Sequence, residues 1–308
     1  MRALDRALGA VLPAVPRPVV GLVAARYIAG EQLDDAVAKV AALAAAGRVA
    51  TVDVLGEASH TREEVAATVA EYRRALAALS AASLPSGISV KPTSLGLGVD
   101  EGQLRESVEG LCREAAASGR FVRIDMEGSA TVDATLALYR GLRAAGVDNG
   151  GIVLQSRLRR TVDDVRALAE LRPSVRLCKG IYVEPPEVAH QEPERVREAY
   201  LEALGLLLQA GSRIGLATHD ERLLRAAVPM VQASGQPVEV QMLLGVREER
   251  ASRLVGEGHR VRVYVPYGVR WYEYSLRRLQ ENPGMAAQIA GDTAAHVLRA
   301  AGRLVRGS

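Results

Sequence analysis

Charged, amide and hydroxyl side chains recur at one kind of place in this sequence, at or just after the ends of short runs of β-branched residues. The set comprises Asp53, Glu57, Lys91, Asp125, Glu127, Gln155, Lys179, Thr218, His219, Gln241 and Tyr264. One such residue alone is more often a hydrogen-bonded structural group than a functional one. If the runs are strands whose ends meet at one rim, these side chains converge and can bind an anion and hold a cofactor.

Two cations in this pattern, Lys91 and Arg176, predict an anion site. Lys91 and Asp125 end consecutive runs, so we expect them to form a buried pair that keeps both charged, with a structural or a functional role left open. Arg176 lies within the fifth run, where an inward guanidinium needs an anion, a carbonyl-rich ligand or a carboxylate. The alternative for Arg176 is an outward-facing strand residue. Gly180, shortly after it, allows a ligand to approach the backbone.

Several common catalytic motifs are absent from the sequence. None of the five histidines belongs to an HxH or HExxH motif, which disfavours a metal site. No GxSxG accompanies the segment Thr218-His219-Asp220, so a hydrolase triad is also disfavoured. The missing GxGxxG and GxxxxGK(S/T) motifs exclude a Rossmann site and a P-loop. The uses left for this segment are hydrogen bonding to a phosphate, or helix N-capping by Asp220.

The elements that must position these residues alternate regularly. Eight β-branched runs predict strands at 50–55, 88–91, 121–126, 151–154, 175–178, 214–217, 238–241 and 261–265. Helical periodicity lies between them, for instance at 61–80, 131–145, 193–209 and 221–233, and an extra helix at 33–46 precedes the first strand. Eight such units predict an α/β fold, a (β/α)8 barrel rather than a doubly wound sheet, with its chemistry at the C-terminal rim.

A further helix is predicted after the eighth strand, in the segment WYEYSLRRLQEN. Arg277 and Arg278 are neighbours in it, and successive helical side chains point about 100° apart. The two guanidinium groups form a carboxylate clamp if this helix lies over the barrel mouth, and a solvated charge run if it does not.

Composition bounds the class of protein. The 308 residues are 48% hydrophobic and 4% aromatic with a net charge of +3, which predicts a folded core of Ala, Val and Leu and no nucleic-acid partner. No apolar stretch is long enough to span a membrane, although an apolar strip near the N-terminus leaves one-sided membrane contact open beside a core-capping helix. Two cysteines without CxxC spacing indicate a reducing compartment. We predict one domain over 1–308, with an N-terminal helical segment at 1–47, the barrel and capping helix at 48–282, and a helical tail at 283–308.

Taken together, the strand ends resemble those of the monofunctional bacterial proline dehydrogenases. The matching segments run in order from Arg26 to Asn282 and are RYIAGE, VDVLGE, SVKPTSLGLG, FVRIDMEGS, GIVLQS, VRLCKGIY, ATHD, VQMLLGVR, VYVPYG and RRLQEN. The resemblance implies a distorted (β/α)8 TIM barrel with a C-terminal helix over its mouth, FAD at the rim, and oxidation of L-proline to Δ1-pyrroline-5-carboxylate. It also implies a membrane quinone as electron acceptor, a separate Δ1-pyrroline-5-carboxylate dehydrogenase, and a cytoplasmic protein, with peripheral contact at the inner face of the membrane left open.

The resemblance assigns roles residue by residue. The residues implied to bind the proline carboxylate are Lys91, Arg277 and Arg278, and those implied to line the ring pocket are Tyr264 and Leu243. Asp125 is implied to pair with Lys91 or the arginines, and Arg176 to hydrogen-bond the flavin near N5. The positions implied to contact or lie near FAD are Met126, Gln155, Lys179, Gly180, Ile181, Tyr182, Thr218, His219 and Glu281.

Some positions depart from the family pattern. Ile181 stands where alanine is usual, which places bulk beside the isoalloxazine, and Pro92 replaces leucine after Lys91. The segment VEVQMLLG lacks the usual aromatic residue. Tyr264 is retained, whereas members acting on hydroxyproline tend to have a smaller residue there, so we expect proline to be the preferred substrate.

Two other readings compete with this one. Lys91 and Lys179 at barrel strand ends are also compatible with a Schiff-base aldolase. A barrel that has lost its activity and only binds or regulates is the non-enzymatic alternative. The charges retained at Lys91, Asp125, Arg176, Arg277 and Arg278 argue against it.

Overall fold

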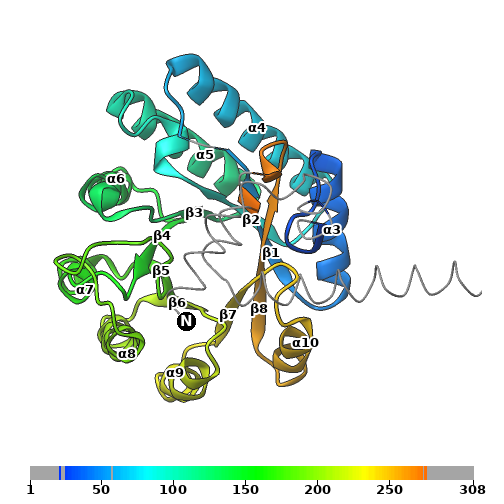
Figure 1. The fold of residues 1–308 in the computed structure, drawn as a ribbon. Coiled ribbons are helices and arrows are strands. Elements are labelled where there is room, and N and C mark those ends of the chain that lie inside the picture. The colour runs from blue at the N-terminus through cyan, green and yellow to red at the C-terminus, as the bar shows by residue number, and fades with distance from the viewer. Residues whose placement is uncertain (1–20, 22–24, 57, 273, 276–308) are drawn as a thin grey trace, which may run out of the picture.

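Eight parallel strands close into a barrel in the computed structural model, which describes residues 21, 25–56, 58–272 and 274–275. The strands pair in sequence order and β8 returns to β1, as Figure 1 shows. Their bounds are β1 Val49–Val54, β2 Ser86–Val90, β3 Val122–Ile124, β4 Gly150–Gln155, β5 Ser174–Cys178, β6 Arg213–Ala217, β7 Glu239–Leu243 and β8 Arg260–Tyr267. All eight predicted strands are therefore confirmed, and so is the (β/α)8 class.

Helices form a ring outside the strands (Figure 1). Their bounds are α3 Leu33–Ala45, α4 Arg62–Ala81, α5 Glu101–Ala117, α6 Val132–Ala144, α7 Thr161–Leu168, α8 Pro193–Gln209, α9 Glu221–Ala233 and α10 Glu248–Gly256. Several begin at a side-chain cap: Thr61 accepts a hydrogen bond from the Glu64 backbone N–H, and Asp100 accepts one from Gln103. The helix predicted before the first strand is present as α3.

The strands present apolar side chains to the helices and polar ones to the barrel interior. Side chains alternate between the two faces of a strand, and residues such as Val52, Ile88 and Leu216 are fully buried in the core. The opposite face is identified by Arg176 on β5, which hydrogen-bonds Asp125 on β3 and Gln241 on β7. Because neither strand is its neighbour, these bonds must cross the interior. The barrel thus encloses a polar, charged layer below its C-terminal rim.

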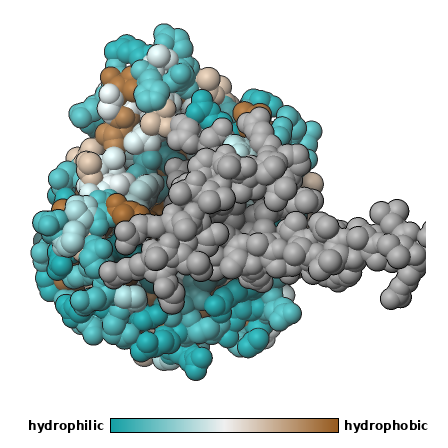
Figure 2. Space-filling model, in the orientation of Figure 1, coloured by the Kyte–Doolittle hydropathy of each residue, from teal (hydrophilic) through white to brown (hydrophobic). Residues whose placement is uncertain are grey.

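The surface around the barrel mixes charge signs, and in the view of Figure 2 the outer surface of the helices is mostly hydrophilic. Among the described residues, the large apolar side chains that are exposed are Ile181, Val183, Val188 and Val269. Within the same part of the chain, no helix combines the length and apolar character needed to cross a bilayer.

Some predicted features fall on residues outside the described ranges. These are the N-terminal apolar strip within 1–20, the helix with Arg277 and Arg278 over the barrel mouth, and the helical tail at 283–308. The single-domain boundaries over 1–308 stay a prediction.

Candidate active site

Lys91, directly after β2, is held by a buried carboxylate on β1. Its Nζ donates to Oδ1 and Oδ2 of Asp53 at 2.6 and 2.7 Å, and the Asp53 side chain is fully buried. The Tyr72 hydroxyl donates to the same carboxylate at 3.3 Å. Burial alone would lower the pKa of Lys91, but the Asp53 and Asp125 carboxylates outweigh it and raise that pKa. Lys91 is therefore kept as an ammonium ion.

The predicted pair between Lys91 and Asp125 is wrong, because Asp125 is occupied by another cation. Arg176 Nη1 donates to Asp125 Oδ1 at 2.7 Å, and Ser89 Oγ donates to the same oxygen at 2.8 Å. The Arg176 and Asp125 side chains are 11% and 14% exposed. Asp53, which the sequence placed among the strand-end residues but not in the site, takes the place of Asp125 beside Lys91.

Arg176 points into the barrel, which excludes its outward-facing alternative. Besides Asp125, it contacts Gln241 through Nε at 2.7 Å, and its guanidinium carbon lies 5.4 Å from the centre of the Tyr264 ring. Such a distance permits a cation–π contact. Two ion pairs, Lys91–Asp53 and Arg176–Asp125, thus lie on either side of Tyr264, whose hydroxyl is 3.5 Å from Lys91 Nζ.

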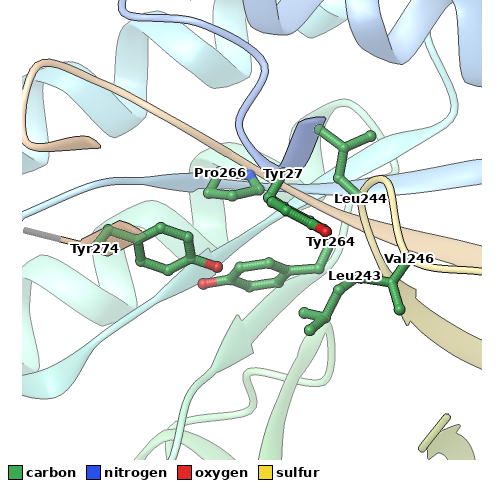
Figure 3. A pocket seen from close by; sticks show the side chains of 7 residues that line it. All are labelled: Tyr27, Leu243, Leu244, Val246, Tyr264, Pro266 and Tyr274. Carbon is green, nitrogen blue, oxygen red and sulfur yellow. The ribbon is translucent and has the colours of Figure 1, made fainter. Parts of the chain in front are cut away.

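A pocket adjoins these pairs and shares Tyr264 with them. Its lining consists of Tyr27, Leu243, Leu244, Val246, Tyr264, Pro266 and Tyr274. Figure 3 shows the hydroxyl ends of Tyr264 and Tyr274 directed toward each other across it. The structure thus brings Leu243 and Tyr264 together, as the sequence predicted. An apolar pocket next to an ammonium group suits a small ring that carries a carboxylate.

Sequence reasoning missed Tyr27 and Tyr274 as pocket residues. Tyr27 lies in the matched segment RYIAGE, and Tyr274 lies shortly before the matched segment RRLQEN, but neither follows a β-branched run. The low aromatic content was the available signal, since with 4% aromatic residues each tyrosine near a strand end is informative.

The cofactor positions predicted on the rim lie at the ends of β3 to β6. Met126 and Gln155 are buried, and Gln155 Nε2 donates to the Glu127 carbonyl at 2.7 Å. Gly180 has φ +96°, and a Cβ there would lie 2.7 Å from Gln155 Oε1, so only glycine lets the β5 loop approach that amide. The Tyr182 carbonyl accepts from Arg157 at 3.0 Å, while Ile181 is 41% exposed.

The remaining rim positions follow β5 and β6. Lys179 Nζ is 3.3 Å from Asp220, the buried Thr218 hydroxyl accepts from the Asp220 N–H at 3.1 Å, and His219 Nε2 accepts from the Leu243 N–H at 3.2 Å. Arg277, Arg278 and Glu281 lie outside the described residues. Among the residues described, no group of three His, Cys, Asp or Glu side chains is placed to hold a metal ion.

Asp220 caps α9, which is one of the two roles that the sequence left open for the segment Thr218-His219-Asp220. Its side chain accepts from the Arg222 and Leu223 N–H groups, and it also binds Arg197 at 2.9 Å. Burial alone would raise the pKa of Asp220, but the bond from Arg197 and the charge of Lys179 lower it from 3.8 to about 2. The cap and the two cations therefore depend on an ionised carboxylate.

We expect the free energy of unfolding of the Asp220→Asn variant to fall less steeply than that of wild type as the pH is lowered into the acid range. A carboxyl whose pKa is depressed on folding stabilises the folded state above its unfolded pKa and loses that contribution as pH falls from 3.8 to about 2. Asparagine caps helices as well as aspartate, so the variant loses the charge and keeps the cap. Urea unfolding at stepped pH measures this; equal slopes for wild type and variant below pH 3.8 would contradict it.

Comparison with known proteins shows the family to which the chain is similar. The family model described as proline dehydrogenase matches residues 36–290. Proline dehydrogenase of Deinococcus radiodurans is 36% identical over 271 residues, covering 86% of this chain and 87% of that protein. Proline dehydrogenase 1 of Bacillus subtilis strain 168 is 34% identical over 267 residues, with 86% and 88% covered.

Solved structures agree on the fold. Proline utilization A (PutA) from Bdellovibrio bacteriovorus, inactivated by N-propargylglycine, is similar with a TM-score of 0.78 and 25% identity over 84% of this chain. PutA from Corynebacterium freiburgense gives a TM-score of 0.74 at 21% identity over 94% of the chain. The chain spans about a third of the length of these proteins, 32% and 34% respectively.

Proposed function

This chain belongs to the proline dehydrogenase family, and on that premise we propose that it oxidises L-proline to Δ1-pyrroline-5-carboxylate with FAD as its cofactor. Electrons would pass from the flavin to a membrane quinone, so the protein would act in the cytoplasm at the inner face of the membrane. The reaction would be the first step from proline to glutamate, with a separate Δ1-pyrroline-5-carboxylate dehydrogenase acting next.

The observation that carries this proposal is the Lys91 ammonium 3.5 Å from the hydroxyl of Tyr264, a residue that lines the tyrosine pocket. Asp53 holds Nζ through two hydrogen bonds, and Tyr264 connects Nζ to the pocket wall. A carboxylate bound by Lys91 would leave an attached five-membered ring against Tyr264 and Leu243. Arg277 and Arg278 would complete the carboxylate clamp, which supplies orientation for the reaction rather than chemistry.

The residues at the rim fit a flavin. Arg176 is anchored on Asp125 and Gln241, so its guanidinium is a fixed donor inside the barrel, and Gly180 allows a flat group to approach the β5 loop. These residues would hold a flavin, whose N5 would supply the hydride acceptor for proline C5. Arg176 would then stabilise the negative charge that accumulates near N5. Lys179, Thr218 and His219 would serve the phosphate side of the cofactor.

The other proposed contacts follow the same rim. Those to FAD are Met126, Gln155, Ile181, Tyr182 and Glu281, in addition to the residues already assigned. Asp125 would act through Arg176, as the carboxylate that fixes its guanidinium.

The charge state of Lys91 argues against a Schiff-base aldolase. Such an enzyme needs a neutral lysine amine, whereas the carboxylates beside Lys91 raise its pKa and hold it protonated. Lys179 is 42% exposed and ion-paired with Asp220, so it lacks the desolvated setting that a Schiff-base lysine needs.

Anaerobic spectra of the purified protein test the proposal. We expect flavin absorption bands that bleach on addition of L-proline and bleach more slowly with trans-4-hydroxyproline, because Tyr264 fills the space beside the ring. Return of the bands on addition of a soluble quinone would identify the acceptor. A colourless protein that also fails to take up added FAD would contradict the proposal, and a higher kcat/KM for hydroxyproline would contradict the substrate preference.

A further inference from the structure

A continuous chain of hydrogen bonds runs through the barrel interior beneath the candidate site. Arg176 Nε donates to Gln241 Oε1 at 2.7 Å, and Gln241 Nε2 donates to Glu239 Oε1 at 2.7 Å. Arg262 donates hydrogen bonds to both carboxylate oxygens of Glu239, at 2.9 and 3.2 Å. Gln241 is 7% exposed, so its amide is shielded from solvent. The chain connects the proposed flavin-binding arginine to β7 and β8.

Glu239 determines which way the Gln241 amide faces. An ionised carboxylate can only accept hydrogen bonds, so the NH2 end of the amide must face Glu239 and the carbonyl end must face Arg176. Burial alone would raise the pKa of Glu239, but the Arg262 charge and hydrogen bonds outweigh it and lower that pKa. Glu239 is therefore ionised at neutral pH. In the opposite orientation, the NH2 group of Gln241 would face the Nε–H of Arg176, and two donors would meet without an acceptor.

Gln241 completes the set of protein partners around the Arg176 guanidinium. Nε is taken by Gln241, and Nη1 is taken by Asp125 and Ser89. Within the described part of the chain, Nη2 makes no hydrogen bond. Because a guanidinium is planar, fixing Nε and Nη1 also fixes the direction of Nη2. Nη2 is thus the edge of Arg176 left for a bound group.

Gly215 on β6 provides the space for this amide. A Cβ at Gly215 would lie 2.2 Å from Gln241 Nε2 and 2.7 Å from its Cδ, closer than any real contact. Glycine weakens a strand interior, since it adds backbone entropy and removes a packing side chain. Its presence on β6 leaves room for the Gln241 amide in the observed position.

We propose that Gln241 is a positioning residue for Arg176, oriented by Glu239 and accommodated by Gly215, and that it sets the guanidinium edge presented to the flavin. This role rests on the proposed function, and it goes beyond the contacts assigned there, because Gln241 itself acts only through Arg176. Loss of Gln241 should therefore change the midpoint potential and the reduction rate of the flavin more than the affinity for proline.

Gln241→Met, Gly215→Ala and Glu239→Gln test the role in three ways. Methionine keeps the volume and removes the acceptor, alanine displaces the amide without removing it, and glutamine removes the charge that orients it. In Gln241→Met we expect anaerobic flavin reduction by proline to slow about tenfold or more, the flavin midpoint potential to fall, and KM for proline to change less than about threefold. The other two variants should shift the potential in the same direction.

Matched controls separate loss of this positioning role from general disruption of the fold. Gln209→Met makes the same change at an exposed position of α8, and Gly256→Ala adds a Cβ where no atom lies within 4 Å, so both should match wild type. If Gln241→Met does not fold, Gly215→Ala and Glu239→Gln decide the outcome. Folded variants with wild-type potential and reduction rate would overturn the role while the wild type still bleaches. A wild type that binds no flavin would overturn the proposed function and this role together.

Discussion

In the Arg176→Lys variant, we expect anaerobic reduction of the bound flavin by proline to slow by about two to three orders of magnitude. The guanidinium donates from two edges, to Gln241 through Nε and to Asp125 through Nη1, each at 2.7 Å. Lysine keeps the positive charge beside Asp125 but offers a single ammonium, so it cannot hold both partners and a bound ligand in one fixed plane. Stopped-flow bleaching at saturating proline measures the effect.

The same substitution at an exposed site provides the control. Arg225→Lys on the outer face of α9 makes an identical chemical change and should reduce the flavin at the wild-type rate. The stability of Arg176→Lys should stay close to wild type, because the buried Asp125 carboxylate keeps a cationic partner. A folded Arg176→Lys variant with an unchanged reduction rate would show that Arg176 does not serve the chemical step.

The second large effect is expected on stability, from Asp53→Asn. Asp53 is fully buried and is the carboxylate that holds Lys91, whose side chain is 16% exposed. Removing one charge of a buried pair leaves the other uncompensated, which costs about 3–5 kcal/mol in the free energy of unfolding. Asparagine keeps an acceptor for the Tyr72 hydroxyl, so the loss reports on the ion pair. Urea unfolding at neutral pH measures it.

A double-mutant cycle with Lys91→Met separates stability from function. The variant carrying both substitutions should be destabilised by less than the sum of the two single changes, because no charge is left unpaired. It should nevertheless bind proline more weakly, since the ammonium is gone, and its KM should rise by a factor that corresponds to a loss of about 2–5 kcal/mol in binding free energy. Strict additivity of the two stability changes would mean that Asp53 and Lys91 do not interact in solution.

Much of the fold could be predicted from the sequence because its signals are local. The β-branched run ATVDVL became β1, and the periodic segment at 193–209 became α8 with identical bounds. Parallel strands require crossover helices, so alternation alone indicated a barrel. The same locality made Asp220 recognisable as a helix cap, since the N–H groups that donate to its carboxylate lie two and three residues further along the chain.

The partners of the charged residues could not be predicted in this way. Lys91 and Asp125 looked like a pair because they end consecutive strands, yet Lys91 binds Asp53 and Asp125 binds Arg176. Two cations and two carboxylates of similar reach face one another in the interior, and small differences in strand register decide which of them meet.

The sequence by itself determined which chemical groups reach the rim, because the two-residue alternation of a strand places every second side chain inside. Only the tertiary structure decided their pairing. Closure of the barrel brings interior side chains of β5 within reach of those of β2 and β7, so that Ser89, Gln241 and Arg176, far apart in sequence, share one hydrogen-bonded layer. Tyr27 likewise joined the pocket through packing against the end of β8 rather than through any local pattern. In a buried layer each polar group needs a partner, and which partner it finds depends on distances across the barrel that no single segment encodes.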